Sequence, residues 1–420
     1  MALFFLFLII NNIKHMKKSA IAVLMAGSLA VSCQNHQVYQ EPTNAPAQNS
    51  PVETKKPNTD YKPAFAGQTR APGVKTQTSY KFEILNTGLG RPWGIINLPD
   101  GRFLVTEKSG FIYLLSKEGT TVNKITGLPQ VDAQGQGGLL DVALDPDFAN
   151  NRMIYWVFSE PVSGGNHTAV AKGRLSSDEK MIENPTVIFR ATPTYNGDKH
   201  YGSRLLFDKQ GNIFFSTGER SDLATRLYAQ KPDAYLGKII HITKDGQPAA
   251  DNPKISGWKP EIYSIGHRNP QSLDIDPATG ELWELEHGPL GGDEINLIKP
   301  GKNYGWGDVT YGLEYSGAKI GAGIQQKEGT EQPVYYWDPV ISPSGIAFYT
   351  GNIEEWKNNL FIGALSGQHI ARIVLKNNKV IGEERLLADQ NERFRDVLNG
   401  VDGNLYAITD SGKLYKISKK

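Results

Sequence analysis

Residues 205–218 read Leu205-Leu206-Phe207-Asp208-Lys209-Gln210-Gly211-Asn212-Ile213-Phe214-Phe215-Ser216-Thr217-Gly218, and this stretch decides the fold. Two short apolar segments flank a polar turn. The aromatic and β-branched residues of both segments favour strands. The Gly-Asn pair supplies the positive φ that a tight hairpin needs. The stretch therefore predicts a β-hairpin.

The same pattern recurs five more times along the chain. The further copies lie at residues 94–106, 141–158, 272–283, 345–363 and 396–410. A second hairpin usually follows each copy, which makes about four strands a unit. Such units repeated around an axis form propeller blades. We therefore predict an all-β fold, a six-bladed β-propeller with four-stranded antiparallel blades, and we expect the strand at residues 80–85 to complete the last blade. A β-sandwich is the alternative.

Composition and charge narrow the function classes. Charged residues make up 21% of the 420 residues, and the formal net charge is +1. Lys and Arg do not form long runs, so no nucleic-acid partner is expected. One cysteine in the whole chain excludes internal disulfides and thiol metal sites. No long amphipathic helix pattern follows the N-terminal region, which disfavours an α/β fold.

The N-terminal region has the composition of an export signal. Residues 1–32 combine basic residues and no acid with a short apolar run, which is typical of a signal peptide. The single cysteine, Cys33, ends Leu29-Ala30-Val31-Ser32-Cys33 and resembles a bacterial lipobox. Translation from Met16 would give a shorter signal. Residues 33–78 are rich in Pro, Asn and Gln and predict a disordered tether. Residues 79–420 form the expected propeller domain, so we predict a membrane-anchored lipoprotein facing the periplasm or cell exterior.

Candidate catalytic residues stand in the loops that a propeller places around its central channel. His200 precedes the hairpin at 205–218, and Glu219 follows it. An imidazole near a carboxylate suits general base catalysis because its ordinary pKa is near 6.5. The alternative is a histidine that only satisfies hydrogen bonds in a loop.

Three arginines are the candidate ligands for a polar or anionic molecule. Arg268 follows His267 in Gly266-His267-Arg268-Asn269-Pro270-Gln271, and His267 itself is more consistent with a structural role. Arg393 and Arg395 share a face if they lie on a strand. Each guanidinium can bind a carboxylate through two hydrogen bonds. Ion pairs with Asp396 or other nearby acids are the alternative use of this pair.

Common cofactor and nucleophile motifs are absent from the sequence. It lacks the Gly-rich loop of dinucleotide-binding proteins and the Walker lysine loop. It also lacks His-x-x-x-His and Cys-x-x-Cys metal patterns and a Gly-x-Ser-x-Gly nucleophile elbow. A cofactor, if present, is bound by other means.

From about Gly88 to Ile417 the chain resembles the soluble pyrroloquinoline-quinone-dependent glucose/aldose sugar dehydrogenases, and the aldose branch above all. The resemblance rests on five segments. They are Gln136-Gly137-Gly138-Leu139-Leu140, Leu144-Asp145-Pro146-Asp147-Phe148, Gly266-His267-Arg268-Asn269-Pro270-Gln271, Glu286-His287-Gly288-Pro289 through Asp293-Glu294-Ile295-Asn296, and Asn303-Tyr304-Gly305-Trp306.

The resemblance implies the following roles. His200 takes the proton of the sugar's anomeric hydroxyl, a hydride passes from C1 to the quinone, and Glu219 orients His200. Arg268 contacts both substrate and quinone. The further quinone contacts implied are Gln136, Asn269, Arg393 and Arg395. A separate acceptor takes the electrons.

The resemblance also implies two calcium sites. The backbone carbonyls of Gly288 and Pro289 match the Ca2+ beside the quinone, where the ion acts as a Lewis acid. Glu294 and Tyr304 match part of a second, structural site.

Two departures from the family pattern bear on function. Ser366 stands where the glucose enzyme has a lysine that reaches the quinone, and Lys199 stands where it has an acid. The dimer-forming insertions are also absent. We therefore expect a monomer that accepts aldoses broadly. A propeller that has lost the quinone and acts as a non-catalytic binding module is the main alternative, and a calcium-dependent lactonase is a third.

Overall fold

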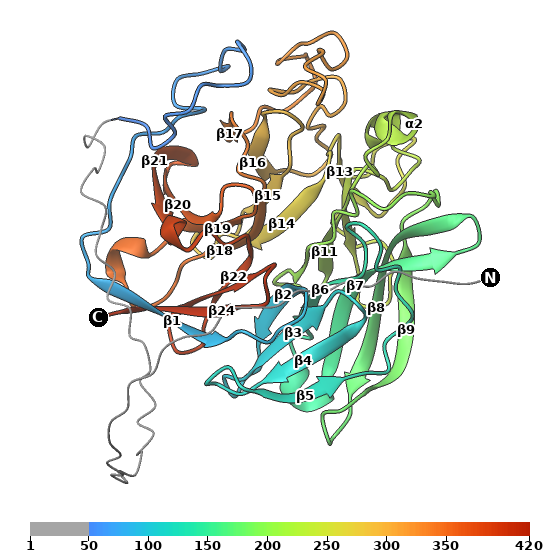
Figure 1. Ribbon diagram of the computed structural model, residues 1–420. Helices are drawn as coiled ribbons and strands as arrows, with labels where there is room; N and C mark the ends of the chain where they lie inside the picture. Colours follow the sequence, from blue (N-terminus) through green and yellow to red (C-terminus); the bar gives the residue numbers. More distant parts are fainter. Residues whose placement is uncertain (1–49) are drawn as a thin grey trace, which may run out of the picture. The chain divides into compact units, whose positions relative to one another are not determined.

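Six four-stranded antiparallel sheets form the protein, and the computed structural model describes them within residues 50–420. Figure 1 shows the sheets arranged in a ring. The first three blades, each from inner to outer strand, are β2 (Pro92–Asn97), β3 (Phe103–Glu107), β4 (Phe111–Leu115), β5 (Thr121–Ile125); β6 (Leu139–Leu144), β7 (Met153–Val162), β8 (Gly165–Leu175), β9 (Ile182–Arg190); β10 (Leu205–Phe207), β11 (Ile213–Thr217), β12 (Lys238–Ile242), β13 (Ile262–Ile265).

The next two blades follow the same order. They are β14 (Pro270–Ile275), β15 (Leu282–Glu286), β16 (Asp293–Ile298), β17 (Tyr335–Trp337); β18 (Pro343–Phe348), β19 (Leu360–Ala364), β20 (His369–Lys376), β21 (Lys379–Leu386). The sixth blade takes β22 (Phe394–Asn399), β23 (Leu405–Thr409) and β24 (Leu414–Lys419) from the C-terminus and β1 (Tyr80–Asn86) from the N-terminal side. β1 pairs with β24 from Tyr80–Lys419 to Asn86–Leu414. The predicted six-bladed propeller is confirmed, and so is the strand that completes its last blade.

The inner strands are in contact around the whole ring. β2 contacts β6 on one side and β22 on the other, and β10, β14 and β18 complete the circle. The decisive hairpin forms as predicted, with Phe207 opposite Ile213 across the β10–β11 pair. Every residue of β11 is buried because neighbouring blades cover both of its faces.

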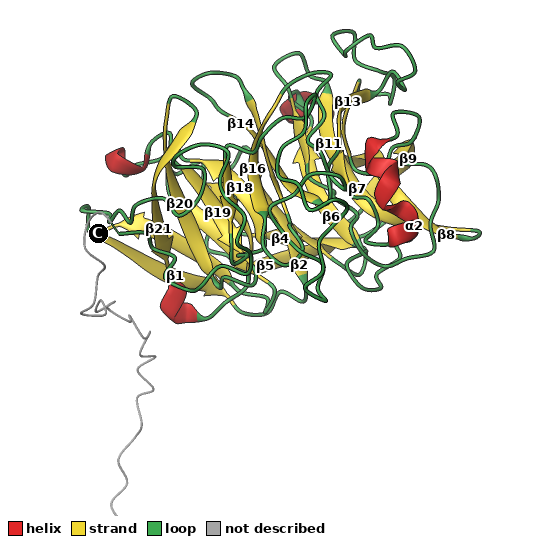
Figure 2. Ribbon diagram, turned by 90° about the horizontal axis from the view of Figure 1, so that it is seen from above, coloured by secondary structure: helices red, strands yellow, loops and turns green. Residues whose placement is uncertain are grey.

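The hydrophobic core lies between adjacent blades. Leu104 and Leu114 of the first blade pack with Trp156 and Phe158 of the second. Helices are few and short, as Figure 2 shows, and comprise α1 (Phe148–Asn151), α2 (Leu223–Arg226), η1 (Leu227–Gln230), η2 (Glu354–Trp356) and η3 (Ala388–Gln390). Over residues 50–420, none of the helices reaches the length and apolarity that crossing a bilayer requires.

The prediction of a disordered tether at residues 33–78 is wrong for residues 50–78. This segment runs past β21 in Figure 1 and packs against the fourth and fifth blades. Thr59 donates two hydrogen bonds to Asp338, from its backbone N and its Oγ1 (3.0 and 2.8 Å). Ala71 is buried, and Thr76 Oγ1 bonds Glu384 at 2.6 Å. Polar side chains make most of these contacts, so no apolar period marks the segment in the sequence.

The signal peptide at 1–32, the lipobox cysteine Cys33 and the rest of the tether, residues 34–49, lie outside the described residues.

Candidate active site

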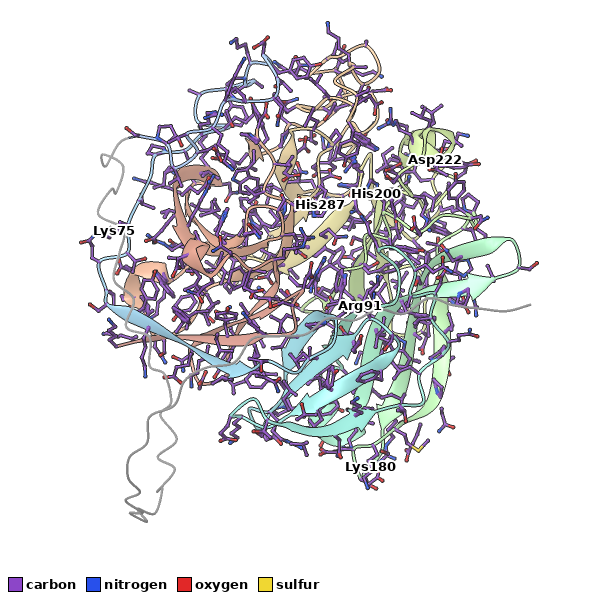
Figure 3. The ribbon with its side chains drawn as sticks, viewed as in Figure 1. Lys75, Arg91, Lys180, His200, Asp222 and His287 are labelled. Carbon is purple, nitrogen blue, oxygen red and sulfur yellow. The ribbon has the colours of Figure 1, made fainter. Side chains whose placement is uncertain are left out.

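A cavity of about 530 Å3 opens where the six inner strands begin. Every blade contributes residues at or just before its inner strand, so the cavity lies at the centre of the ring. Arg91, His200 and His287, which belong to the lining, lie near the middle of the ring in Figure 3. The lining comprises Arg91, Pro92, Trp93, Lys108, Gly135, Gln136, Leu140, His200, Tyr201, Gly202, Arg268, Gln271, His287, Gly288, Pro289, Tyr315, Val340, Ser342, Leu365, Ser366, Arg393, Arg395 and Asp410. A volume of this size is typical of small-molecule sites.

His200 and Glu219 form a buried hydrogen-bonded pair at the cavity. The distance from His200 Nδ1 to Glu219 Oε1 is 2.6 Å, and the two side chains are 5% and 2% exposed. His200 lines the cavity, whereas Glu219 lies behind it. When Nδ1–H donates to the carboxylate, Nε2 keeps its lone pair, so the imidazole can accept a proton there.

Two glycines let the loops that carry this pair approach each other. A Cβ at Gly218 would lie 2.1 Å from the carbonyl oxygen of His200, and one at Gly202 would lie 2.7 Å from the backbone of Thr217. Both distances are far below contact, so only glycine fits. His200 itself has φ of 48°, a left-handed conformation that costs energy in a non-glycine residue. Local packing therefore holds the histidine in place.

Burial shifts the pKa values of both partners. Desolvation lowers the pKa of His200 well below its usual 6.5, and the positive charges of Arg268, Arg220 and Lys199 lower it further. Desolvation raises the pKa of Glu219 to about 7, against the opposing effect of Arg268. His200 is therefore a neutral base at neutral pH.

The predicted quinone contacts Gln136 and Asn269 hold the His200 loop. Gln136 Oε1 accepts a hydrogen bond from His200 N at 2.8 Å, and Asn269 Oδ1 accepts one from Gly202 N at 3.1 Å. Asn269 Nδ2 is buried without a partner in the described chain. An unpaired buried amide donor is costly, and a ligand oxygen would satisfy it.

Arg268 lines the cavity and bonds the loop after β15. Its Nη1 donates to the carbonyls of His287 and Gly288, both at 2.9 Å. Its guanidinium lies over the ring of Trp306, 5.1 Å from the centroid. Its Nε is buried and has no partner among the described residues.

Arg393, just before β22, and Arg395, within it, reach the same carboxylate, which is the ion-pair alternative for this pair. Both Nε atoms lie 2.8 Å from oxygens of Asp410. The acid is Asp410 rather than Asp396, because Asp396 bonds Arg204 Nη1 at 2.9 Å. Both arginines line the cavity.

A second, buried ion cluster joins residues of the second, third and sixth blades. Arg204 Nη1 lies 3.1 Å from Asp141 Oδ1, and the guanidinium covers the ring of Trp93 at 4.5 Å. All three charged side chains, Arg204, Asp141 and Asp396, are buried. Burial raises the pKa of Asp141 to about 6, and the charge of Arg204 opposes this shift. The guanidinium of Arg204 therefore packs against the ring of Trp93, which lines the cavity.

The residues of the cavity fit a polyanionic quinone. Five cationic side chains line it, namely Arg91, Lys108, Arg268, Arg393 and Arg395, against the single carboxylate of Asp410. The unpaired Nε of Arg268 adds hydrogen-bonding capacity, whereas Asn269, a predicted quinone contact, is not part of the cavity lining. Charge complementarity of this kind is typical of sites for anionic ligands.

Gly288 and Pro289 line the cavity, but they make an incomplete calcium site by themselves. Ca2+ takes six to eight oxygen ligands. The Gly288 carbonyl already accepts a hydrogen bond from Arg268, and the one carboxylate in the lining is Asp410. Calcium here would need further oxygens from a bound cofactor and from water.

Glu294 and Tyr304 lie away from the main cavity, around a small adjacent pocket. The hydroxyl of Tyr304 bonds Leu297 O and Lys299 N, so it is already occupied. Glu294 pairs across the sheet with Glu286, and two like charges in such a pair repel. Burial raises the pKa of Glu294 well above its usual value, and Glu286 adds to this shift.

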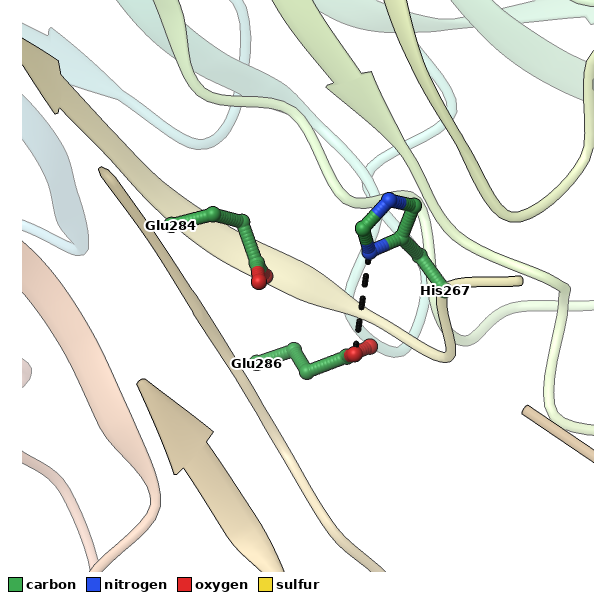
Figure 4. Close-up of side chains that lie close together, drawn as sticks. All are labelled: His267, Glu284 and Glu286. Carbon is green, nitrogen blue, oxygen red and sulfur yellow. Dashed lines mark ion pairs between the residues drawn. The ribbon is translucent and has the colours of Figure 1, made fainter. Parts of the chain in front are cut away.

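Sequence reasoning did not assign His267, Glu284 or Glu286 to a metal site. Ligand atoms of His267, Glu284 and Glu286 lie within 4.8 Å of one another. Figure 4 shows the three side chains close together. Glu284 Oε1 and His267 Nδ1 are buried and have no hydrogen-bond partner within the described chain, although His267 Nδ1 lies 3.7 Å from Glu286 Oε1. Buried carboxylates without a cation are costly, so this group fits a divalent ion. The sequence Glu-Leu-Glu in β15 could have indicated this site, because alternate residues of a strand lie on one face and place both carboxylates together.

The comparisons with known proteins agree with this geometry. The family model described as "Glucose / Sorbosone dehydrogenase" matches residues 89–416. The aldose sugar dehydrogenase YliI of Escherichia coli (strain K12) is 42% identical over 346 residues, which are 80% of this chain and 92% of the relative.

Solved structures agree as well. A crystal structure of glucose dehydrogenase is 44% identical with a TM-score of 0.78, covering 81% of this chain and 100% of its own. The PQQ-bound form of an aldose sugar dehydrogenase from Streptomyces coelicolor is 28% identical with a TM-score of 0.67, covering 81% and 99%. The propeller, its central cavity and these similarities lead to one conclusion: the chain belongs to the glucose/sorbosone dehydrogenase family.

Proposed function

We propose that the protein oxidises aldose sugars at C1 to lactones, transferring a hydride to pyrroloquinoline quinone (PQQ) with calcium assistance. The supporting observation is the buried His200–Glu219 pair beside a cavity lined by five cations. Family membership supports sugar oxidation as the reaction class. The PQQ-bound relative supports the choice of cofactor.

His200 removes the proton from the anomeric hydroxyl. Its Nε2 takes that proton, while the two electrons of the C1–H bond leave as hydride, so C1 becomes the carbonyl carbon of the lactone. Glu219 stabilises the resulting imidazolium through its 2.6 Å bond to Nδ1. When bound, PQQ supplies the two-electron acceptor, and a separate acceptor of unidentified chemistry then collects the electrons.

The other residues hold the reactants. Arg268 is placed to bind both the sugar oxygen and the cofactor, since it lines the cavity with an unpaired Nε. Arg393 and Arg395 bind carboxylates of the quinone, and Gln136 and Asn269 keep the His200 loop in position. Gly288 and Pro289 offer carbonyls to the calcium beside the cofactor. Glu294, with Glu284 and Glu286, holds a second calcium, to which Tyr304 contributes a backbone oxygen.

The wider setting follows from the N-terminal sequence. We propose that the mature protein is a monomer anchored to a membrane through lipid on Cys33, outside the cytoplasm. Metabolic labelling with a radioactive fatty acid, compared between the wild type and Cys33→Ala, tests the anchor.

The test of activity is reconstitution. Purified protein receives calcium and PQQ, and dye reduction is measured with several aldoses. We expect a quinone spectrum and turnover with more than one sugar. Binding of the quinone without oxidation of any sugar would refute sugar oxidation. Absence of both the quinone spectrum and turnover would refute the proposal and favour the non-catalytic binding module that has lost the quinone.

A pair of variants isolates the base. His200→Gln should abolish turnover and keep PQQ bound. His167→Gln is the matched control, because His167 forms a similar buried pair with Glu160 (2.7 Å) away from the cavity lining. Equal activity of His200→Gln and the control would exclude His200 as the base.

A further inference from the structure

Two cations of the first blade line the cavity and have no assigned role. Arg91 immediately precedes β2, and Lys108 lies in the turn between β3 and β4. The first and sixth blades are neighbours, since β2 contacts β22. Arg91 and Lys108 are therefore in the sector of the cavity that also holds Arg393 and Arg395.

Lys108 is held firmly in this position. Its backbone N donates to Arg91 O at 3.1 Å, and its carbonyl accepts from Leu139 N at 3.0 Å. A Cβ at Gly138 would come within 2.5 Å of Lys108 Cγ, so glycine is needed for the next blade to pass this close. The stem of Lys108 is thus packed between two blades.

The ammonium of Lys108 has spare hydrogen-bonding capacity. Its Nζ donates to one carbonyl, that of Gly135, and an ammonium has three donors. Among residues 50–420 no carboxylate lies within ion-pair distance of it. Asp410 and Asp198 act on it only from farther away. Burial lowers the pKa of Lys108, and the charges of Arg91 and Arg395 lower it further.

The charge around Lys108 is unbalanced without a ligand. Asp410 is shared between Arg393 and Arg395, which leaves those two arginines with one uncompensated charge. Lys108 and Arg91 add two more. Cations placed side by side repel one another, so this arrangement is favourable when an anion with several charges is bound.

The fifth blade offers no cation to the cavity. Its contribution includes Ser342, Leu365 and Ser366, and the hydroxyls of Ser342 and Ser366 bond each other at 2.8 Å. The quinone carries three carboxylates. Arg393 and Arg395 suit two of them, and the neighbouring first blade adds Arg91 and Lys108, whose side chains have no carboxylate partner among the described residues.

We propose that Lys108, supported by Arg91, binds a carboxylate of the quinone from the first blade and so supplies the cation that Ser366 does not. This inference rests on the proposed function, because it concerns the same cofactor. In this assignment the third positive charge on the quinone site comes from the first blade rather than from the fifth. The first blade adjoins the sixth blade, where the ring closes.

Equilibrium titration with PQQ tests this assignment, followed by the quinone absorbance or by quenching of tryptophan fluorescence, with no sugar present. The variant is Lys108→Gln. The matched control is Lys117→Gln, because Lys117 lies beyond the opposite end of β4 and does not line the cavity. Thermal unfolding of each apoprotein establishes that both variants are folded.

Loss of one charge-assisted contact should raise the Kd of Lys108→Gln about 10- to 100-fold. The control should stay within about twofold of the wild type. Lys108→Arg should bind more tightly than Lys108→Gln because the charge is kept. Adding Ser366→Lys to Lys108→Gln should restore much of the affinity. High salt should weaken wild-type binding more than binding by Lys108→Gln.

The outcomes distinguish failure of the Lys108 assignment from failure of the proposed function. If the wild type binds PQQ and Lys108→Gln binds within about twofold of it, the assignment of Lys108 is wrong and the proposed function stands. If the wild type binds no PQQ, the proposed function is wrong, and the assignment fails with it.

Discussion

Replacing Glu219 by Gln tests the base and its orienting acid together. The substitution keeps the shape of the side chain, and the amide oxygen can still accept from His200 Nδ1. It removes the negative charge that stabilises the imidazolium. The bond is 2.6 Å long between side chains that are 5% and 2% exposed. A buried charge-assisted bond contributes about 1.5–3 kcal/mol, so kcat should fall about 10- to 150-fold.

The pH dependence gives a second, independent readout. In the wild type, burial raises the pKa of Glu219 to about 7. As the pH falls through this value, the His200–Glu219 pair takes up a proton, and this proton blocks catalysis. A protonated carboxyl then donates to Nδ1, which places the histidine proton on Nε2 and removes the base. Activity is therefore present above pH 7 and lost below it.

In Glu219→Gln only His200 can take up a proton. Its pKa lies well below 6.5 because of burial and the charges of Arg268, Arg220 and Lys199. The acid limb of kcat/KM should therefore move to lower pH, although the rate is smaller. Glu160→Gln, in the similar pair with His167, should leave rate and profile unchanged.

The assay is dye reduction by the PQQ-loaded enzyme between pH 5 and 9, at saturating and at low aldose. An acid limb that stays near pH 7 in Glu219→Gln would refute the assignment of that proton to the pair. A rate equal to the wild type would refute the role of Glu219 as orienting acid.

Three more predictions concern stability. Arg204→Met leaves Asp141 and Asp396 buried without their partner and should cost about 3–5 kcal/mol in chemical denaturation; a loss below about 1 kcal/mol would contradict the ion cluster. Removing the chain before residue 79 should lower the Tm, because Ala71 is buried and Thr76 bonds Trp356 at 2.7 Å; an unchanged Tm would mean that the segment is not docked. Added Ca2+ should raise the Tm of the wild type and not that of Glu294→Gln, and chelation should reverse the increase; equal responses would place the ion elsewhere.

The sequence predicted the propeller because each blade is built from strands that are close together in the chain. Hairpins such as 205–218 are encoded within a dozen residues, through alternating apolar residues and a Gly-Asn turn. Repetition of that local signal gives the blade number. The strand expected at residues 80–85 completes the last blade, and the structure shows that its partner is β24.

The N-terminal segment at 50–78 escaped the same reasoning. Its ordering depends on Asp338 and Glu384, which lie roughly 300 residues away in the chain. Polar contacts across such separations leave no period in the sequence. Composition therefore predicted a disordered tether, whereas residues 50–78 pack against the propeller.

By itself, the sequence determined the fold, the family and the candidates His200, Glu219, Arg268, Arg393 and Arg395. Only the tertiary structure decided which groups share a site, because the cavity forms where six separate blades meet. It paired His200 with Glu219, gave Asp410 rather than Asp396 to the two arginines, and separated Glu294 and Tyr304 from the cavity. It also brought Lys108 to the wall beside Arg395, a proximity that depends on closure of the ring.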